Sequence, residues 1–292
     1  MDYSRCELCP RMCGVNRGAG QKGFCGCPDT ALVAKAMLHK WEEPALAGSG
    51  GSGAVFFGGC TLGCRYCQNA AISGGPVGTP TDSAGLRRMF EELIAQGAEN
   101  IDLVTPTQFL PTLLPALTPK LPVPVVYNCG GYERVETLRA LEGRVDIYLP
   151  DLKYADGALA EALSGAPDYF PVACDAIREM FRQTGRPVYD EEGIMQRGVI
   201  VRHLVLPGYP DNTRRVLDWL SETFAPGDVV VSLMSQYTPP AGMTGRLARR
   251  VTAAEYRAAV AYMRACGITD GFVQERTSAE EAYTPAFDGT GV

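Results

Sequence analysis

Short β-rich runs alternate with helical patterns along most of this 292-residue chain, and this alternation constrains the fold more than any other feature. In a strand–helix–strand unit the helix returns the chain to the starting end of the sheet, so successive strands run parallel. About six such units are typical of a full or partial barrel. The sequence therefore predicts an α/β fold, a partial (β/α)6 barrel with a Cys-rich N-terminal extension.

The elements of this barrel can be placed along the chain. The runs predicted as strands are Ala54–Phe57, Asn100–Leu103, Val123–Tyr127, Asp146–Leu149, Gly198–Leu206, Val229–Leu233 and Gly271–Gln274. The stretches predicted as helices are Ser83–Gln96, Glu133–Leu141, Asp168–Gln183, Asn212–Phe224 and Ala253–Cys266. These assignments rest on apolar periodicity, which differs between helices and strands. We expect the chemistry at the carboxyl ends of the strands, where the polar and Gly-rich motifs fall.

Cysteine is unevenly distributed along the chain. Eleven cysteines are present, and eight of them lie within the first 67 residues. In a cytoplasmic chain of this size such clustering favours metal ligation over disulfides, and thiolates select zinc, copper(I) or iron–sulfur clusters. We therefore divide the chain into a Cys-rich metal-binding extension, residues 1–46, and a core domain, residues 47–292. A Gly/Ser-rich run, Ala47–Gly53, is expected to be a flexible loop between them.

Composition limits the classes of partner. Charged residues make up 21% of the chain and the net charge is −6, so nucleic acid is not expected as a partner. No run approaches the roughly 20 apolar residues that a membrane-spanning helix needs, and the first residues contain no apolar signal core. We expect a cytoplasmic protein that does not engage a membrane.

Three cysteines directly follow the first predicted core strand. Cys60, Cys64 and Cys67 are separated by three and then two residues, and the aromatic Tyr66 precedes the last of them. A cubane cluster normally takes four thiolates, so three local thiolates leave one iron open to another ligand. The alternative is a structural zinc loop completed by a distant cysteine.

This cysteine spacing, with its aromatic residue, resembles the signature of the radical S-adenosylmethionine (SAM) superfamily. Further motifs follow in an order similar to that of an uncharacterised branch related to pyruvate formate-lyase activating enzyme. These motifs are Leu103-Val104-Thr105-Pro106-Thr107, Tyr127-Asn128-Cys129-Gly130-Gly131-Tyr132-Glu133, Leu149-Pro150-Asp151-Leu152-Lys153-Tyr154, Arg202-His203-Leu204-Val205-Leu206-Pro207-Gly208 and Met234-Ser235-Gln236-Tyr237. The resemblance implies a barrel of the radical SAM type, with a [4Fe–4S] cluster on Cys60, Cys64 and Cys67 that binds SAM.

The resemblance also implies a set of residues that contact SAM. Asn128 would lie near the SAM carboxylate, and Asp151, Lys153 and Arg202 match residues that contact SAM in activating enzymes. Thr105 and Thr107 stand where those enzymes have Gly-Gly-Glu, so here hydroxyl and carbonyl groups would replace a carboxylate at the SAM amino group. Gln236 would contact the ribose or adenine, and Tyr66 would pack near the adenine. His203 is expected on the opposite strand face from Arg202, in a structural role.

The implied activity is reductive cleavage of SAM to a 5′-deoxyadenosyl radical, which then abstracts a hydrogen atom. The substrate would be a protein, as in the activation of a glycyl-radical enzyme, or a peptide or small molecule. An electron donor such as flavodoxin or ferredoxin would reduce the cluster. The alternative from another class is a non-catalytic iron–sulfur electron carrier or a zinc-organised binding module.

A second group of thiols lies in the extension. Cys6, Cys9 and Cys13 are followed by Cys25 and Cys27, and four ligands from these five could hold a second metal. Either zinc or a second [4Fe–4S] cluster suits such a set. We expect Cys6, Cys9, Cys13 and Cys25 to be the ligands.

Overall fold

The computed structural model describes residues 2–273 and 287–292. The strands are β1 (Ala31–His39), β2 (Ser52–Phe57), β3 (Thr79–Thr81), β4 (Ile101–Val104), β5 (Val125–Cys129), β6 (Ile147–Pro150), β7 (Val188–Tyr189), β8 (Met195–Leu204), β9 (Val230–Met234) and β10 (Gly271–Val273). The α-helices are α1 (Pro44–Ala47), α2 (Ala70–Ser73), α3 (Ser83–Ala95), α4 (Leu110–Ala116), α5 (Val135–Arg139), α6 (Gly157–Ser164), α7 (Tyr169–Thr184), α8 (Pro210–Thr223) and α9 (Ala253–Ala265). Short 3₁₀ helices span Arg17–Ala19, Thr107–Phe109 and Gly245–Ala248.

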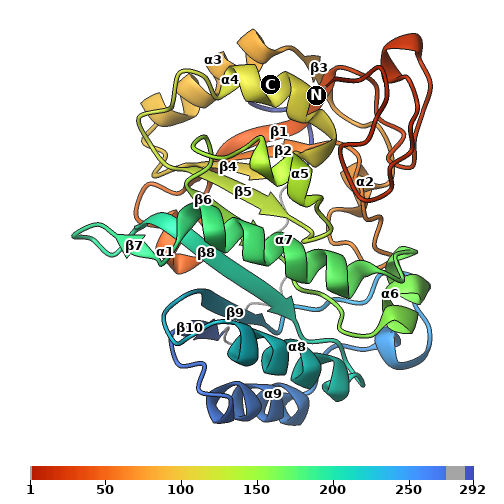
Figure 1. Ribbon diagram of the computed structural model, residues 1–292, viewed down its shortest axis with the longest axis vertical. Helices are drawn as coiled ribbons and strands as arrows, with labels where there is room; N and C mark the ends of the chain where they lie inside the picture. The colour runs from red at the N-terminus through yellow and green to blue at the C-terminus, as the bar shows by residue number, and fades with distance from the viewer. Residues whose placement is uncertain (1, 274–286) are drawn as a thin grey trace.

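The strands form one sheet in the order β10-β9-β8-β6-β5-β4-β2-β1-β3, with β7 paired to β8. From β2 to β10 along this order neighbouring strands are parallel, whereas β1 is antiparallel to β2 and β3 is antiparallel to β1. The sheet keeps two edges, β10 and β3, so the barrel is not closed. The partial α/β barrel predicted from the alternating pattern is confirmed (Figure 1).

The predicted core strands correspond to β2, β4, β5, β6, β8, β9 and β10, with shifts of up to three residues at their ends. Gln274, the last residue of the predicted final strand, lies outside the described residues. Three strands were not predicted: β1, β3 and β7. Six consecutive residues of β1 are buried, and β1 lies within the segment assigned to the N-terminal extension. In addition, β2 already begins at Ser52, inside the Gly/Ser-rich run expected to be a flexible loop.

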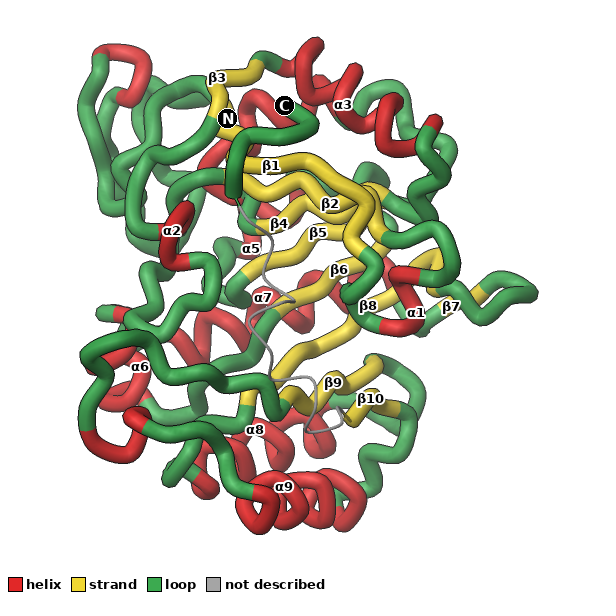
Figure 2. Tube along the Cα trace, turned by 180° about the vertical axis from the view of Figure 1, so that it is seen from behind, coloured by secondary structure: helices red, strands yellow, loops and turns green. Residues whose placement is uncertain are grey.

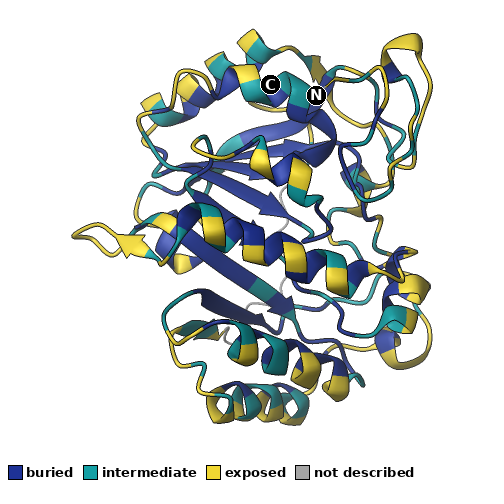
Figure 3. Ribbon diagram, viewed as in Figure 1, coloured by how far each residue is buried: buried dark blue, intermediate teal, exposed yellow. Residues whose placement is uncertain are grey.

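The two faces of the sheet are covered differently. The larger helices pack on one face (Figure 1), and the main apolar core lies between these helices and alternate strand residues such as Leu103 and Tyr127. The other face is seen from behind in Figure 2 and carries two smaller apolar clusters, one around Val126 and Ile200 and one around Phe56. The central strands β2, β4, β5, β6 and β9 are buried on both faces, while β7 and the outward sides of α7, α8 and α9 are exposed (Figure 3). Among the described residues, no helix is long and apolar enough to cross a membrane.

His203 links β8 to α8 on the helix-covered face, as its position next to Arg202 predicted. Its Nδ1 lies 2.6 Å from the carbonyl oxygen of Leu152 and therefore donates. Its Nε2 then accepts from the hydroxyl of Thr213 at 3.0 Å. Burial lowers the pKa of His203 to about 4, so the ring is neutral in the folded protein at neutral pH.

This buried histidine predicts a loss of stability in mild acid. The unfolded chain binds a proton at His203 near its usual pKa of about 6.5, whereas the folded chain does so only near pH 4. The contribution of His203 is therefore present above about pH 6.5 and falls by roughly 3 kcal/mol as the pH drops toward 4. Urea unfolding at several pH values should show a shallower decline for His203→Gln than for the unchanged protein. His39 is present in both proteins, so its titration cancels, and equal slopes would contradict the assignment.

Candidate functional site

The loop that follows β2 carries Cys60, Cys64 and Cys67 at the carboxyl end of the parallel strands. Its first residues are closely packed: a Cβ at Gly58 would lie 1.7 Å from the carbonyl oxygen of Val77, and one at Gly59, whose φ is +73°, would lie 2.3 Å from Cys27 Sγ. The buried amide of Gln108 donates to the carbonyl oxygens of Gly58 and Gly59 at 3.0 and 3.2 Å. Gln108 thereby fixes the start of the loop to the chain after β4.

The three thiols are half-buried and electrostatically coupled. Burial, followed by the nearby Cys64 thiol, raises the pKa of Cys60 to about 12. Burial also raises the pKa of Cys64, although Lys153 opposes this shift, and Ser164 Oγ donates to Cys64 Sγ at 3.1 Å. The Cys60 and Cys64 thiols are therefore protonated at neutral pH until a metal takes them.

The donor set of this loop fits an iron–sulfur cluster in kind and number. It offers three soft thiolate ligands on eight residues, which leaves one iron of a cubane for a further ligand. Within residues 2–273 and 287–292, no three His, Cys, Asp or Glu side chains are grouped so that they could already hold a metal ion. Since neighbouring thiolates repel one another, we expect metal binding to gather them.

Polar side chains from three neighbouring strands meet beside this loop. Arg202 on β8 donates from Nε to Asp151 Oδ1 at 3.0 Å and from Nη2 to Asn128 Oδ1 at 2.6 Å. Lys153 pairs with the other oxygen of Asp151. Burial alone would raise the pKa of Asp151, but the charges of Arg202 and Lys153 outweigh it and lower that pKa. The structure thus brings together Asn128, Asp151, Lys153 and Arg202, with Asp151 ionised between two cations.

Three carboxyl groups that the sequence analysis did not select join this cluster. Glu42 Oε1 lies 3.4 Å from Arg202 Nη1, and Glu42 Oε2 and Asp102 Oδ2 each accept from Asn128 Nδ2 at 3.3 Å. Glu43 Oε1 accepts from Ser232 Oγ at 2.8 Å. The sequence did contain a signal for Asp102, because a charged residue inside the apolar run Ile101–Val104 requires a partner.

The other residues predicted to contact SAM lie apart from this cluster or are otherwise engaged. Thr107 donates to Glu133 Oε1 and accepts from the hydroxyl of Tyr127, each at 2.9 Å, on the opposite face of the sheet from Asn128. Thr105, at the end of β4, has a φ of +59°, a strained conformation for threonine. These SAM contacts stay predictions.

Tyr66 and Gln236 both lie near the cysteine loop. Tyr66 is buried against the rings of Tyr154 and Tyr237, whose centroids lie 6.4 and 5.8 Å away. The carbonyl oxygen of Gln236 accepts from the side chain of Gln68, on the loop itself, at 3.0 Å. Their predicted contacts with adenosine also stay predictions.

The N-terminal cysteines divide into separate neighbourhoods. Cys9 is close enough to Cys13 and Cys25 for their charges to raise its pKa, which burial, the largest cause, brings to about 12. Cys6 lies 3.9 Å from Nη1 of the buried Arg17. Cys27 lies between Cys25 and the cysteine loop: its Sγ is 3.4 Å from the carbonyl oxygen of Cys25 and 3.6 Å from that of Gly58.

Arg11 ties the N-terminal segment to the cysteine loop. Its guanidinium donates to the carbonyl oxygens of Thr61 and Leu62 at 3.1 and 3.2 Å, and to those of Ser164 and Gly165, at the end of α6, at 2.8 and 2.5 Å. It also lies 3.9 Å from the centre of the Phe24 ring. The sequence analysis gave Arg11 no role.

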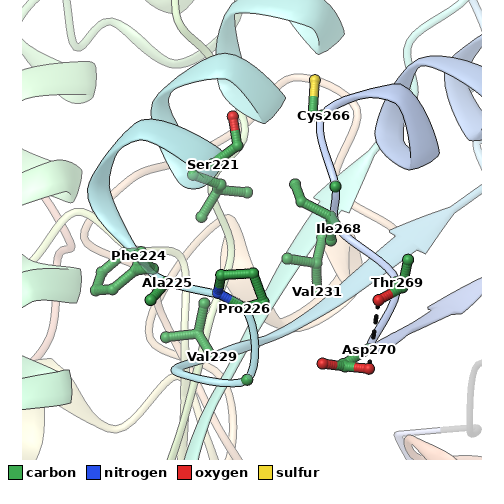
Figure 4. Close-up of a pocket in the computed structure, with 13 residues that line it drawn as sticks. Ser221, Phe224, Ala225, Pro226, Val229, Val231, Cys266, Ile268, Thr269 and Asp270 are labelled. Atoms are coloured by element: carbon green, nitrogen blue, oxygen red, sulfur yellow. Dashed lines mark hydrogen bonds between the residues drawn. The ribbon is translucent and has the colours of Figure 1, made fainter.

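A small pocket between α8, β9 and β10 lies away from these residues (Figure 4). It is lined by residues that precede β9 and β10, including Pro226, Val229, Ile268 and Asp270. Since β9 and β10 run parallel to the other core strands, this pocket is at the amino end of the sheet, opposite the cysteine loop.

Comparison of the sequence with known proteins identifies a relative. A scan against models of protein families gives no match. An uncharacterized protein of Methanocaldococcus jannaschii is 30% identical over 251 residues, which are 81% of this chain and 67% of that protein.

Solved structures resemble the fold at low identity. SuiB of Streptococcus suis bound to S-adenosylmethionine is 13% identical with a TM-score of 0.52, over 74% of this chain and 48% of SuiB. HydG, a maturase of the [FeFe]-hydrogenase, is 15% identical with a TM-score of 0.53, over 77% of this chain and 52% of HydG. Methylornithine synthase (PylB) is 13% identical with a TM-score of 0.50, over 75% of this chain and 70% of PylB. The chain therefore spans about half the length of SuiB and HydG.

The contacts of Arg11 predict that this residue orders the cysteine loop. Arg11→Met keeps an apolar stem but removes four hydrogen bonds from a charged donor, and should lower the free energy of unfolding by about 2–4 kcal/mol. In the same variant, amide hydrogen exchange over residues 60–67 should become faster. Arg65→Met removes an exposed charge from the same loop and should leave both unchanged. Unaltered exchange in Arg11→Met would contradict the role.

Proposed function

This chain belongs to the radical SAM superfamily and to the family of the M. jannaschii protein, and we propose that it reductively cleaves S-adenosylmethionine and abstracts a hydrogen atom from a substrate. The observation that carries the proposal is the position of the loop with Cys60, Cys64 and Cys67. This loop leaves the first parallel core strand beside the charged groups of Asp151, Lys153 and Arg202. A simple electron carrier has no need of such groups.

The cofactors would supply the difficult chemistry. When bound, a [4Fe–4S] cluster and SAM provide electron transfer into the sulfonium and release of a 5′-deoxyadenosyl radical. Cys60, Cys64 and Cys67 would hold the cluster, and each thiol would lose its proton on binding. The radical SAM fold supports this reading, while the individual ligands are our assignment.

The protein's own residues would bind and orient SAM. Lys153 and Arg202 are cations suited to the SAM carboxylate, and Asp151 keeps both in place by accepting from each. Asn128, whose Oδ1 accepts from Arg202, would add a neutral hydrogen bond to the SAM carboxylate. Thr105 would contact the SAM amino group, while Tyr66 and Gln236 would contact the adenosine.

The proposal extends to the class of substrate and to the electron donor. The substrate is a protein, as in the activation of a glycyl-radical enzyme, or a peptide or a small molecule. An electron donor such as flavodoxin or ferredoxin reduces the cluster, and neither a nucleic acid nor a membrane takes part. We place the protein in the cytoplasm, where thiols stay reduced.

The proposed cleavage can be measured directly. Anaerobically reconstituted protein, reduced with dithionite, should release 5′-deoxyadenosine from SAM. Cys60→Ala should reduce the release to background, whereas Cys174→Ala, which removes a buried thiol on α7, should not. If the reconstituted protein releases no more than Cys60→Ala does, the proposal is wrong, and an electron carrier or a zinc-organised module becomes the better description. If the protein does release 5′-deoxyadenosine, deuterium tracing across candidate substrates would identify the hydrogen donor.

The second group of thiols is proposed to hold its own metal, either zinc or a further [4Fe–4S] cluster. Cys13 and Cys25 both lie within electrostatic range of Cys9, and Cys6 is the fourth ligand that we assign. Cys13→Ala should lower the bound metal by the content of one site and leave the Cys60 site loaded, and elemental analysis would distinguish zinc from iron. Metal content that stays equal to that of Cys174→Ala would rule out a second site.

A further inference from the structure

The face of the sheet away from the helices is unusually polar at its centre. Asp102, Asn128, Arg202 and Ser232 lie on four strands, β4, β5, β8 and β9, and their immediate neighbours Leu103, Tyr127, Val201 and Val231 pack under the helices. Because successive strand residues face opposite sides, the four polar side chains share the other face, which Figure 2 views. Glu42 and Glu43 reach them from the segment between β1 and α1. We call Glu42, Glu43 and Asp102 the interior carboxyl cluster.

The charges that the described residues place on this face do not balance. Four carboxyl groups, those of the interior carboxyl cluster and of Asp151, meet two cations, Arg202 and Lys153. Arg202 pairs with Asp151 and Glu42, and Lys153 pairs with Asp151. Asp102 and Glu43, by contrast, form no ion pair among the described residues, although each has 7% or less of its surface exposed.

Buried carboxyl groups without a cation hold their protons. Burial, and next the charge of Glu42, raises the pKa of Asp102 well above its ordinary value and that of Glu43 to about 7. A cation between them would favour the ionised form and displace those protons. Within the described part of the chain, no cation therefore keeps Asp102 or Glu43 ionised.

Unpartnered polar atoms mark the same region. Among the atoms of residues 2–273 and 287–292, Asp102 Oδ1 is buried with no hydrogen-bond partner, and so are Ser52 Oγ and Asn100 Oδ1. Ser52, on β2, shares a sheet face with Ala54, and Asn100, just before β4, shares one with Asp102. All three atoms therefore belong to the face away from the helices. Buried polar atoms are nearly always paired, so three atoms without a partner on one face point to a bound group that hydrogen-bonds with them.

We propose that the interior carboxyl cluster binds the cationic group of the substrate, an alkylammonium or a guanidinium. Such a group donates several hydrogen bonds. It also carries a positive charge, which neither Asp102 nor Glu43 has as a partner among the described residues. Asp102 lies two residues before the end of β4, about 7 Å below the strand ends that the cysteine loop follows, so the site is deeper than the residues assigned to SAM. The assignment of the cation to a substrate rests on the proposed function. The binding of a cation at this cluster does not.

Calorimetry with reconstituted protein, without reductant, tests the site with n-butylammonium and n-butylguanidinium as probes. We expect at least one of them to bind, n-butanol not to bind, and binding at about pH 6 to release protons, seen as a dependence of the heat on the ionisation enthalpy of the buffer. Asp102→Asn and Glu42→Gln should each weaken binding by about tenfold or more, as expected for one charge-assisted hydrogen bond. Asp175→Asn, which alters an exposed ion pair on α7, should not.

Saturating SAM separates the two sources of such a cation. Binding of the probe that survives SAM supports a separate substrate, whereas displacement by SAM would assign the cluster to the SAM amino group and overturn the proposal. It is equally overturned if neither probe binds, if n-butanol binds as well, or if both variants bind like Asp175→Asn. A protein that binds the probes but releases no 5′-deoxyadenosine contradicts the proposed function and the substrate assignment, and leaves the cation site standing.

Discussion

The ion pair between Arg202 and Asp151 is the interaction on which the site depends. An arginine on a buried strand is costly unless its charge is matched, and the two residues also form the last bridge between β6 and β8. Arg202 in turn fixes Asn128 on β5 and Glu42 from the segment after β1. One guanidinium therefore sets the position of groups from three other parts of the chain, close to the point where the cysteine loop begins.

A second arginine plays the corresponding role for the N-terminal segment. Arg17 is almost fully buried and donates to the carbonyl oxygens of Pro28 and Gln108, so it joins the extension to the chain after β4. Together with Arg11 it holds a segment that has little apolar core of its own. Hydrogen bonds to backbone carbonyl groups thus provide much of the order of this segment.

The sequence predicted the core of the fold because each parallel strand is an apolar run followed by a helix with a periodic face. It failed for β1, since nothing local distinguishes an antiparallel first strand from an extension. For the site, motifs at strand ends led us to predict Cys60, Cys64, Cys67, Asn128, Asp151, Lys153 and Arg202. The structure brings the last four together, and their roles stay predictions. Glu42 and Glu43 were missed because their partners Arg202 and Ser232 are more than 150 residues away, and such contacts leave no local pattern.

The central claim is that the loop of Cys60, Cys64 and Cys67 holds a cluster with an iron open to SAM. Electron paramagnetic resonance of the dithionite-reduced, reconstituted protein tests it most directly, with spectra recorded before and after SAM is added. The account predicts a [4Fe–4S] signal that SAM changes and that Cys60→Ala loses. A reduced cluster whose signal is the same with and without SAM, or a protein that holds only zinc, would contradict it.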